Sequence, residues 1–410
     1  MNYIEKLLQG KKVEWKRLGN VCKIETGKLN ANQEKIDGQY LFFTCDEFPK
    51  KIDIYTHDTE AILISGNGSK LGHVTHYKGK FNAYQRTYIL SRFSDEIDIR
   101  YLFFVLLKGF REHANQNKKP GSVPYIVLEN VSGFQIPIPP LEIQEKIVAI
   151  LDKFTELTAE LTAELTTELT ARKKQYSYYR ENLFAFKNDS RRLNNFQLKT
   201  LGEVGAFIRG GGLQKKDFTA TGVGCIHYGQ IYTHYGTYAT KTKSFVSEEF
   251  AKKARIAKPG DLVIATTSEN DEDLCKAVAW IGDEDIAVSS DACFYRHNME
   301  PKYVAYFFQT EYFKKQKSPF ITGAKVRRVN ANDLAKFKIP VPTLKEQARI
   351  VAILDKFDTL TTSISEGLPK EIELRQKQYE YYRDLLLTFP STPADPEPTK
   401  KSTKKTTAKK

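Results

Sequence analysis

The amino-acid sequence predicts an α+β fold: two globular α/β domains separated by two long antiparallel, coiled-coil-like helices, related by an internal pseudo-twofold duplication. Three observations support this prediction. Three motifs recur at one constant offset, the stretch that follows each proline-rich motif has the composition of a long helix, and the stretches before these motifs mix short β-type runs with single helical segments. The chain is therefore built from two copies of a globular part followed by a helix.

The duplication consists of three motifs that recur 203 residues later in the chain. Because one offset relates all three, the stretches between the motifs have the same length in both copies. The matched sequences are Ile136-Pro-Ile-Pro-Pro-Leu141 and Ile339-Pro-Val-Pro-Thr-Leu344, Gln144-Glu-Lys-Ile-Val-Ala-Ile-Leu-Asp-Lys-Phe154 and Gln347-Ala-Arg-Ile-Val-Ala-Ile-Leu-Asp-Lys-Phe357, and Arg172-Lys-Lys-Gln-Tyr-Ser-Tyr-Tyr-Arg180 and Arg375-Gln-Lys-Gln-Tyr-Glu-Tyr-Tyr-Arg383.

These boundaries predict five segments. The globular domains are residues 1–141 and 188–342, the long helices are residues 142–187 and 343–389, and residues 390–410 are a Pro- and Lys-rich tail expected to be disordered. In the globular domains, runs rich in β-branched and aromatic residues predict strands. The expected strands are Tyr40–Thr44, Glu60–Ile64, Thr87–Leu90, Asp261–Ala265 and Ala292–Tyr295, and the expected helices are Arg100–Arg111 and Pro301–Lys317.

The first long helix contains neither Pro nor Gly between residues 142 and 186, which predicts one helix roughly 65 Å long. Its middle repeats Thr-Ala-Glu-Leu, so that leucines recur every four residues and form a stripe that turns by about 40° per step. One repeat adds about 6 Å and about 40°, and the rotation is close to that of one B-DNA base pair. If the two globular domains read DNA, a spacer of this type can change their separation while roughly preserving their rotational phase; the alternative is repeat slippage in a tolerant coiled coil.

In the second long helix, Gly367 and Pro369 predict a kink or a short break. The tyrosines near the ends of both helices are expected to pack there, with contact to a partner protein as the alternative. The residues that we assign to helix pairing or partner binding are Leu157, Leu161, Leu165, Leu169, Tyr179, Leu360, Ile364 and Tyr382.

The loops between the predicted strands are polar and basic, and the chain has a net charge of +13, which favours a polyanionic partner. Residues 116–122 and 321–328 occupy equivalent places before the two proline-rich motifs. Lys and Arg neutralise phosphates, and Arg, Lys, Asn and Gln read base edges, although a solvated surface is the alternative for each residue. The DNA-binding candidates are Asn67, Ser69, Lys70, Gln85, Arg86, Lys118, Lys119, Ser122, Arg209, Lys215, Lys216, Lys325, Arg327 and Arg328.

No motif of a catalytic or metal site is present in the sequence. The Gly-rich stretch 66–72 fails the dinucleotide fingerprint at Leu71, and neither a Walker motif nor metal-ligand spacing of the seven histidines occurs. Five cysteines without a Cys-x-x-Cys pair, and the lack of a secretion signal or an apolar span, predict a cytosolic protein with reduced thiols. The residues thus favour a binding and scaffolding protein, with an enzyme as the alternative.

The duplicated helix motifs and the Thr-Ala-Glu-Leu units resemble the specificity subunit of type I restriction-modification systems, in the subgroup whose central helix carries such repeats. The resemblance extends to about Phe389. It implies two DNA target-recognition domains that each read one half of a split, asymmetric site, and helices that set the spacing. It also implies that Tyr3–Leu8, which resembles the helix end Tyr179–Phe184, closes onto the second helix.

The resemblance implies a non-catalytic subunit that binds double-stranded DNA and no membrane, in the bacterial cytoplasm. Its expected partners are two methyltransferase subunits and two motor-nuclease (restriction) subunits. This chain is expected to bind no cofactor or metal itself: S-adenosylmethionine belongs to the methyltransferase, and ATP and Mg²⁺ belong to the motor-nuclease. The alternatives are a stand-alone, two-lobed DNA-binding regulator or architectural protein, and a coiled-coil adaptor without sequence preference.

Overall fold

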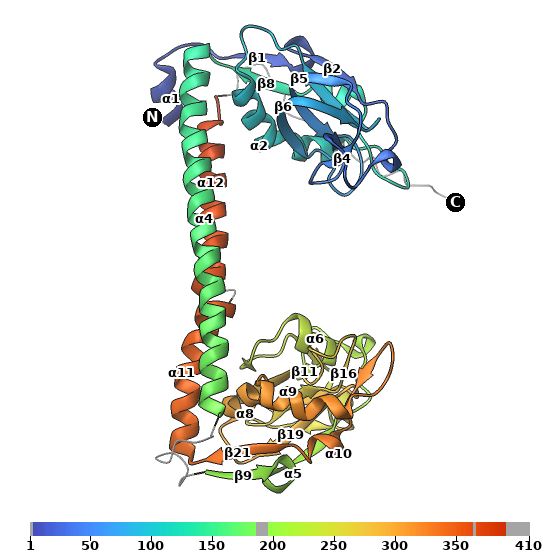
Figure 1. The fold of residues 1–410 in the computed structure, drawn as a ribbon, viewed down its shortest axis with the longest axis vertical. Coiled ribbons are helices and arrows are strands. Elements are labelled where there is room, and N and C mark those ends of the chain that lie inside the picture. The colour runs from blue at the N-terminus through green and yellow to red at the C-terminus, as the bar shows by residue number, and fades with distance from the viewer. Residues whose placement is uncertain (1–2, 186–195, 364–365, 391–410) are drawn as a thin grey trace, which may run out of the picture. The chain divides into compact units, whose positions relative to one another are not determined.

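The computed structural model describes residues 3–185, 196–363 and 366–390, and the chain divides into two compact units. Unit 1 comprises residues 1–162 and 374–410, and unit 2 comprises residues 163–373. Each unit therefore combines one globular lobe with helical segments from both copies of the duplication (Figure 1). The predicted tail lies outside the described residues, apart from Pro390.

The lobe of unit 1 is built on a six-stranded sheet with strand order β2-β7-β5-β6-β3-β4, in which only the β3–β6 pair is parallel. Every residue of β7 is buried, as expected for a continuous apolar run in the middle of a sheet. The bounds are β2 Lys23–Thr26, β3 Tyr40–Phe43, β4 Lys50–Ile52, β5 His57–Ser65, β6 Val74–Ala83, β7 Thr87–Ser91, α2 Ile99–Asn117 and α3 Leu128–Ser132, with η1 Leu18–Asn20, η2 Ala31–Gln33 and the pair β1 Glu14–Arg17 and β8 Gln135–Ile138.

The lobe of unit 2 contains a five-stranded sheet, β10-β19-β15-β17-β12, and a four-stranded sheet, β13-β11-β18-β14. All residues of β15, β17 and β18 are buried. The bounds are β9 Phe196–Thr200, α5 Leu201–Val204, β10 Gly205–Arg209, η3 Lys215–Asp217, β11 Val223–Ile226, α6 Tyr228–Thr233, β12 Tyr238–Ala239, β13 Ser244–Val246, α7 Glu248–Ala251, β14 Ile256–Ala257, β15 Leu262–Ala265, β16 Thr267–Ser268, β17 Ala277–Trp280, β18 Ile286–Val288, β19 Ala292–His297, α8 Pro301–Phe307, α9 Glu311–Lys317, η4 Ser318–Phe320, β20 Arg327–Arg328, α10 Ala331–Leu334 and β21 Lys338–Pro342.

The predicted strands are all present, and the helical stretch predicted at Pro301–Lys317 is divided in two. Residues 301–317 form two helices, α8 and α9, because Thr310 begins a new helix by accepting a hydrogen bond from the amide of Phe313. The break leaves the side chain of Gln309 available to bond the end of the first long helix, as described below.

The duplication is repeated in the hydrogen bonds that attach each lobe to its proline-rich motif. The hydroxyls of Tyr101 and Tyr303 donate to the carbonyl oxygens of Pro137 and Pro340, each at 2.9 Å. The buried amides of Gln144 and Gln347 each donate to a proline carbonyl oxygen five residues earlier, at 2.8 Å. Their carboxamide oxygens each accept from the backbone at the start of α2 or α8, at 2.9 Å. The two lobes are thus held on their helices by the same joint.

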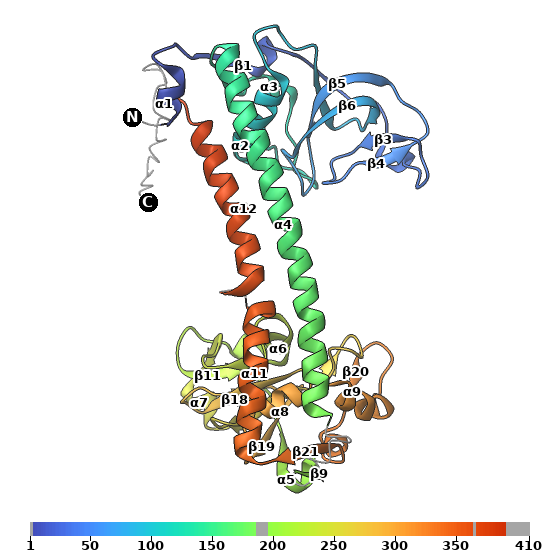
Figure 2. The same cartoon turned by 60° about the vertical axis from the view of Figure 1, so that its left-hand side comes forward.

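The first long helix is α4, Leu141–Phe184, a single helix of 44 residues that confirms the prediction for this segment. It begins in unit 1 and ends in unit 2. The second long helix is divided into α11, Leu344–Thr362, and α12, Gly367–Leu386 (Figure 2). Gly367 has φ +77°, and a Cβ there would lie 2.4 Å from the carbonyl oxygen of Thr359. The break predicted from Gly367 and Pro369 is therefore confirmed.

In unit 1 the start of α4 packs against the end of α12. Phe154 stacks on Tyr382, with ring centroids 5.8 Å apart, and Thr155 Oγ1 lies 3.1 Å from the hydroxyl of Tyr379. A later residue of α4 thus meets an earlier residue of α12, so the two segments run antiparallel. Helix α1, Tyr3–Leu8, buries Ile4 and Leu8 in the same core as the end of α12 (Figure 2). The predicted closure of the N-terminus onto the second helix is confirmed.

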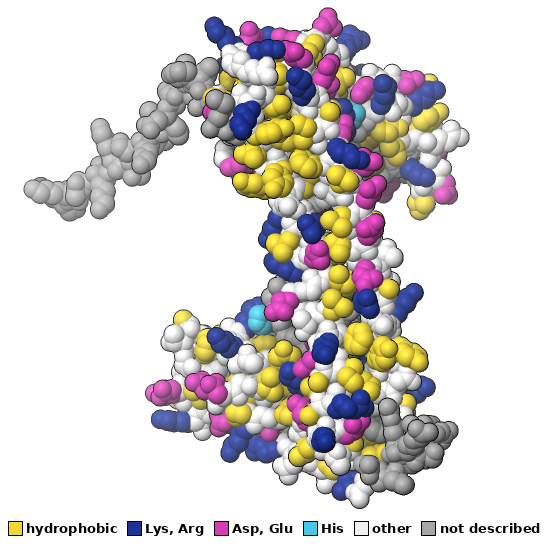
Figure 3. Space-filling model, turned by 90° about the vertical axis from the view of Figure 1, so that its left-hand side faces the viewer, with side chains coloured by type: hydrophobic (Ala, Val, Ile, Leu, Met, Phe, Trp, Pro, Cys, Tyr) yellow, Lys and Arg dark blue, Asp and Glu magenta, His cyan; other side chains and the backbone are white. Residues whose placement is uncertain are grey.

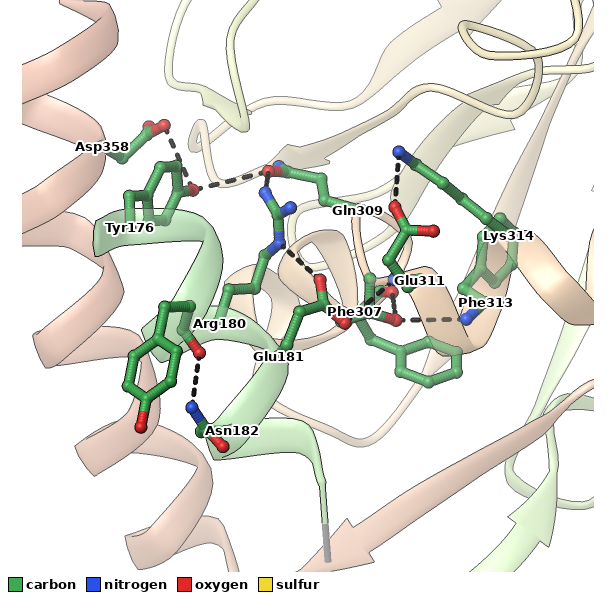
Figure 4. A network of polar contacts seen from close by, with 12 residues as sticks. Tyr176, Arg180, Glu181, Asn182, Phe307, Gln309, Glu311, Phe313, Lys314 and Asp358 are labelled. Carbon is green, nitrogen blue, oxygen red and sulfur yellow. Dashed lines mark hydrogen bonds and ion pairs between the residues drawn. The ribbon is translucent and has the colours of Figure 1, made fainter. Parts of the chain in front are cut away.

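In unit 2 the end of α4 is fixed to the lobe by a polar network (Figure 4). The hydroxyl of Tyr176 donates to the side chains of Gln309 (3.4 Å) and Asp358 (3.5 Å), and Arg180 also donates to Gln309 (3.4 Å). The carboxylate of Glu181 accepts a hydrogen bond from the amide of Glu311, at 3.0 Å. These contacts join α4 to α11 and to the start of α9, so α4 is held at both of its ends.

Candidate nucleic-acid interface

Three loops of unit 1 meet at the edge of the six-stranded sheet: residues 66–72 after β5, residues 84–86 before β7, and residues 117–126 after α2. The amide of Gly66 donates to the carbonyl oxygen of Arg86 at 2.9 Å, and the amide of Ile126 donates to the carbonyl oxygen of Gly66 at 3.0 Å. Asn67 and Lys119 both bridge to Tyr125 through the backbone. We call this arrangement the three-loop frame of unit 1.

Gly66 permits an especially close approach of two loops in unit 1. A Cβ at this position would lie 2.3 Å from the carbonyl oxygen of Arg86, so a larger residue would push the loops apart. With the loops closed, the Arg86 guanidinium lies over the Tyr125 ring, 5.6 Å from its centroid.

Unit 2 contains the same frame in equivalent loops: residues 266–270, 289–291 and 321–330. The amide of Thr266 donates to the carbonyl oxygen of Asp291 at 3.0 Å. The amide of Val329 donates to the carbonyl oxygen of Thr266 at 3.2 Å. Thr322 and Arg328 exchange two backbone hydrogen bonds of 2.9 Å, as Lys119 and Tyr125 form a bridge in unit 1. The predicted equivalence of the two basic loops before the proline-rich motifs is therefore confirmed.

The two frames share their backbone but not their side chains. Thr266 replaces Gly66, Asp291 replaces Arg86, and Arg328 replaces Tyr125, as judged by the matching hydrogen bonds. A common scaffold thus presents two different sets of donors, acceptors and charges at its surface.

The frame of unit 2 encloses an open cavity of about 260 Å³. The side chains around it combine two guanidinium groups with a carboxylate and several hydroxyls or amides. Thr267 Oγ1 donates to the Asp291 carboxylate at 3.4 Å, and the exposed Arg209 donates through Nε to the carbonyl oxygen of Ser290 at 3.3 Å. The cavity is lined, among others, by Arg209, Thr266, Thr267, Asp291, Arg328 and Asn330.

The structure brings most of the candidate residues of unit 1 onto the frame. Ser69, Gln85, Lys118, Lys119 and Ser122 are exposed on its loops. The other candidates, Asn67, Lys70 and Arg86, lie on the same loops, but the Lys70 ammonium is paired with Glu47 at 2.5 Å and lowers the pKa of that carboxyl. Part of the positive charge of Lys70 is therefore already neutralised within the lobe.

In unit 2 the candidates are more scattered. Arg209 and Arg328 line the cavity, Lys325 is exposed on the loop 321–330, and Arg327 pairs with Asp271 at 2.9 Å. Lys215 and Lys216 lie on η3 and are not among the residues that line the cavity. The sequence-based selection of basic residues missed three members of the frames. They are Tyr125, Asp291 and Asn330; of these, Asp291 directly precedes the buried start of β19, which is a signal that the sequence offered.

The helix residues assigned to pairing or partner binding differ in exposure. Leu161, Leu165, Leu169 and Leu360 are half-buried, whereas Leu157, Tyr179 and Tyr382 are exposed. Ile364 lies outside the described residues. Tyr179 also stacks on Phe357 in unit 2, as Tyr382 stacks on Phe154 in unit 1, so the expected packing at helix ends is present.

The described residues contain no group of three or more His, Cys, Asp or Glu side chains that could hold a metal ion. In the same part of the chain, no helix is both long and apolar enough to cross a membrane. Burial raises the pKa of the Cys225 and Cys275 thiols to about 12, so neither is present as a thiolate at neutral pH.

Comparison with known proteins gives a consistent result over nearly the whole chain. The family described as "Type I restriction modification DNA specificity domain" matches twice, at residues 10–171 and 194–374. The sequence is 34% identical over 409 residues to the specificity subunit of the Escherichia coli type I restriction enzyme EcoR124I/EcoR124II, covering 95% of this chain and 98% of that protein. It is also 34% identical over 412 residues to a putative type I specificity subunit of Haemophilus influenzae, covering 94% and 98% of the two chains.

Solved structures share the fold at lower sequence identity. A chain from a study of complex assembly and conformational transition of the type I R-M system aligns with a TM-score of 0.65 and 17% identity, covering 92% of this chain and 97% of that one. The HsdS subunit from Thermoanaerobacter tengcongensis aligns with a TM-score of 0.51 and 17% identity, over 92% and 95% of the two chains.

Proposed function

The chain belongs to the specificity subunits of type I restriction-modification systems, and from this membership we propose that each of its lobes reads one half of a split, asymmetric DNA site. The observation that carries the proposal is the pair of three-loop frames. Their hydrogen bonds match, while the side chains differ at the positions where the loops meet. Two identical readers would recognise a symmetric site, so two different readers imply two different half-site sequences.

Direct reading of DNA requires both positioning and base contacts. Exposed lysines on the frame loops, such as Lys118, Lys119 and Lys325, are suited to phosphates because their charge acts without a fixed geometry. Side chains at the junction of the loops are suited to base edges, since the backbone beneath them is fixed by hydrogen bonds. The major groove offers a distinct pattern of donors and acceptors for each base pair.

The long helix α4 is suited to act as the spacer between the two readers. Its first turns are anchored in unit 1, where Ile143, Ile147 and Leu151 are buried in the core. Its last turns are anchored in unit 2, where Tyr176 and Phe184 are buried. Between these ends the repeat residues are exposed or half-buried, so the length of the repeat can change without altering either anchor.

Exposed apolar residues on the helices support docking of partner subunits. Three pairs separated by 203 residues are exposed in both copies: Leu141 and Leu344, Tyr178 and Tyr381, and Tyr179 and Tyr382. Hydrophobic side chains, interspersed with lysines and arginines, are visible on the helical face in Figure 3. Duplicated exposed residues imply two equivalent docking surfaces, which suits two methyltransferase subunits.

The assembly proposed is that of the family. This chain would be non-catalytic, and it would direct adenine methylation by two methyltransferase subunits that bind S-adenosylmethionine. Two motor-nuclease subunits, which use ATP and Mg²⁺, would complete a restriction enzyme in the bacterial cytoplasm. The basic charge of this chain, +13, supports DNA as the common substrate of the complex.

The proposal is tested by mapping DNA methylation with long-read sequencing in a host that carries this gene, with and without the cognate methyltransferase gene. A split, asymmetric methylated motif that appears only with both genes is the expected result. If no motif appears, and the purified chain alone selects one DNA sequence from a random pool, the chain is a stand-alone regulator and the proposal is wrong.

A further inference from the structure

The two frames differ most in charge at the point where their loops meet. In unit 1 this point carries Arg86, held over the ring of Tyr125. In unit 2 the equivalent positions carry Asp291 and Arg328, which line one cavity. A carboxylate at a DNA-facing surface is unusual for a phosphate site, since it repels the phosphate oxygens. The cavity of unit 2 is therefore better suited to base edges than to the backbone.

The backbone around both residues is fixed. The carbonyl oxygen of Asp291 accepts two hydrogen bonds from Thr266, from its amide and from its hydroxyl, each at 3.0 Å. Arg328 lies on strand β20, opposite Thr267 of β16, and exchanges two backbone bonds with Thr322. Its guanidinium makes no hydrogen bond or ion pair with any residue in the described ranges 3–185, 196–363 and 366–390. An exposed fork of donors thus stands on a fixed backbone, and a half-buried carboxylate lines the same cavity.

The pair matches the major-groove edge of one base pair. Guanine presents two neighbouring acceptors, N7 and O6, which a guanidinium contacts with two hydrogen bonds, and cytosine presents an amino donor beside them, which a carboxylate accepts. In an A·T pair the two acceptors are separated by the adenine amino group, so the guanidinium fork cannot contact both. The charge pattern of the cavity therefore selects G·C over A·T.

We propose that Asp291 and Arg328 together read one G·C base pair in the half-site bound by unit 2, with the guanidinium on guanine and the carboxylate on cytosine. This inference rests on the proposed function and adds to it the residues and the base pair that determine specificity. The frame of unit 1 has no carboxylate at the equivalent position, because Arg86 stands there, so its half-site does not carry the same requirement.

The test uses the full chain in complex with its methyltransferase partner and selects DNA from a random pool. The variants are Arg328→Ala and Asp291→Asn, and the matched control is Lys325→Ala, on the same loop but not lining the cavity. The wild type should select G·C at one position. Each variant should lower the preference for G·C over the other base pairs at that position by about 5- to 150-fold. Lys325→Ala should instead weaken binding to all sequences alike and reduce the salt dependence.

The half-site read by unit 1 serves as an internal control, since its preference persists only if the variant complex is folded and bound. The inference is overturned if the two variants lose sequence preference at different positions, or if the position that loses its preference is A·T in the wild-type site. It is also overturned if either variant weakens binding to all sequences equally. In each of these cases the wild type still selects a split site, and the proposed function stands. A wild-type complex that selects no split site overturns both.

Discussion

Removal of one repeat from α4 should shorten the preferred DNA spacer without changing either half-site. Deleting Thr162–Leu165 removes four residues, and therefore about 6 Å of helix and about 40° of rotation. B-DNA rises about 3.4 Å per base pair and takes about 10 to 10.5 base pairs per turn. The lost length corresponds to just under two base pairs and the lost rotation to about one. We expect the spacer to shorten by one to two base pairs, measured by methylation mapping.

A two-residue deletion, Leu161–Thr162, provides the matched control. It removes only about 3 Å, close to one base pair, but rotates the rest of α4 by about 200°, so it places the leucine stripe and the far lobe out of phase. If α4 sets both distance and phase, this variant should methylate no split site. An unchanged spacer in the four-residue deletion, or an active two-residue deletion with a spacer one base pair shorter, would refute the reasoning.

The other predictions concern docking and stability. Tyr178 and Tyr381 are 65% and 64% exposed at equivalent positions, so replacing either by Ser should reduce the number of methyltransferase subunits bound per chain from two to one. Replacing both should abolish binding, as measured by native mass spectrometry. A variant chain that still binds two methyltransferase subunits would contradict this prediction. Burial lowers the pKa of the His297 imidazole to about 4, so the folded protein keeps the ring neutral while the unfolded chain protonates below about pH 6.5. Stability should therefore be lost as the pH falls from about 6.5 towards 4, by roughly 2 kcal/mol between pH 7.5 and 5, and His297→Gln should flatten that part of the urea-unfolding profile; an identical slope in the variant would exclude His297 as the cause. The buried Lys317 ammonium donates to the carbonyl oxygens of Asp271 and Leu274, each at 2.7 Å, so Lys317→Met should lower the free energy of unfolding by about 2–4 kcal/mol, whereas Lys315→Met, on the exposed side of α9, should leave it nearly unchanged.

The sequence was most informative where it repeated. Identical motifs at one offset predicted a constant helical part that carries two different globular parts, and the joints built on Gln144 and Gln347 make matching hydrogen bonds. Gly367 signalled the break between α11 and α12, because α12 begins there with φ +77°, a left-handed backbone conformation that favours glycine. The helical stretch predicted at Pro301–Lys317 is divided at Thr310, a residue type that is favoured at the start of a helix, and the composition of the segment alone did not indicate this division.

The candidate site was predicted only in part, because the frame is held by backbone hydrogen bonds. Basic residues such as Arg86 and Arg328 are visible in the sequence, but their places on the frames follow from the closure of the loops onto Gly66 in unit 1 and onto Thr266 in unit 2. Asp291 carries a charge opposite to that expected of a DNA-binding residue, so a search for positive charge passes over it. The role of such a residue depends on its neighbours, and these come together only in the folded lobe.

A frame held by backbone bonds separates stability from specificity. The loops of unit 2 are joined by backbone hydrogen bonds among Thr266, Asp291 and Val329, and the hydroxyl of Thr266 adds one bond to the carbonyl oxygen of Asp291. Because every residue except proline provides both an amide and a carbonyl group, most side chains at the junction can change without loss of the backbone bonds, apart from positions such as Gly66 in unit 1 where the backbones approach closely. Duplication gives two such frames on one pair of helices, so each half of a DNA site can change independently while the joints, the spacer and the exposed tyrosines of the helices remain the same.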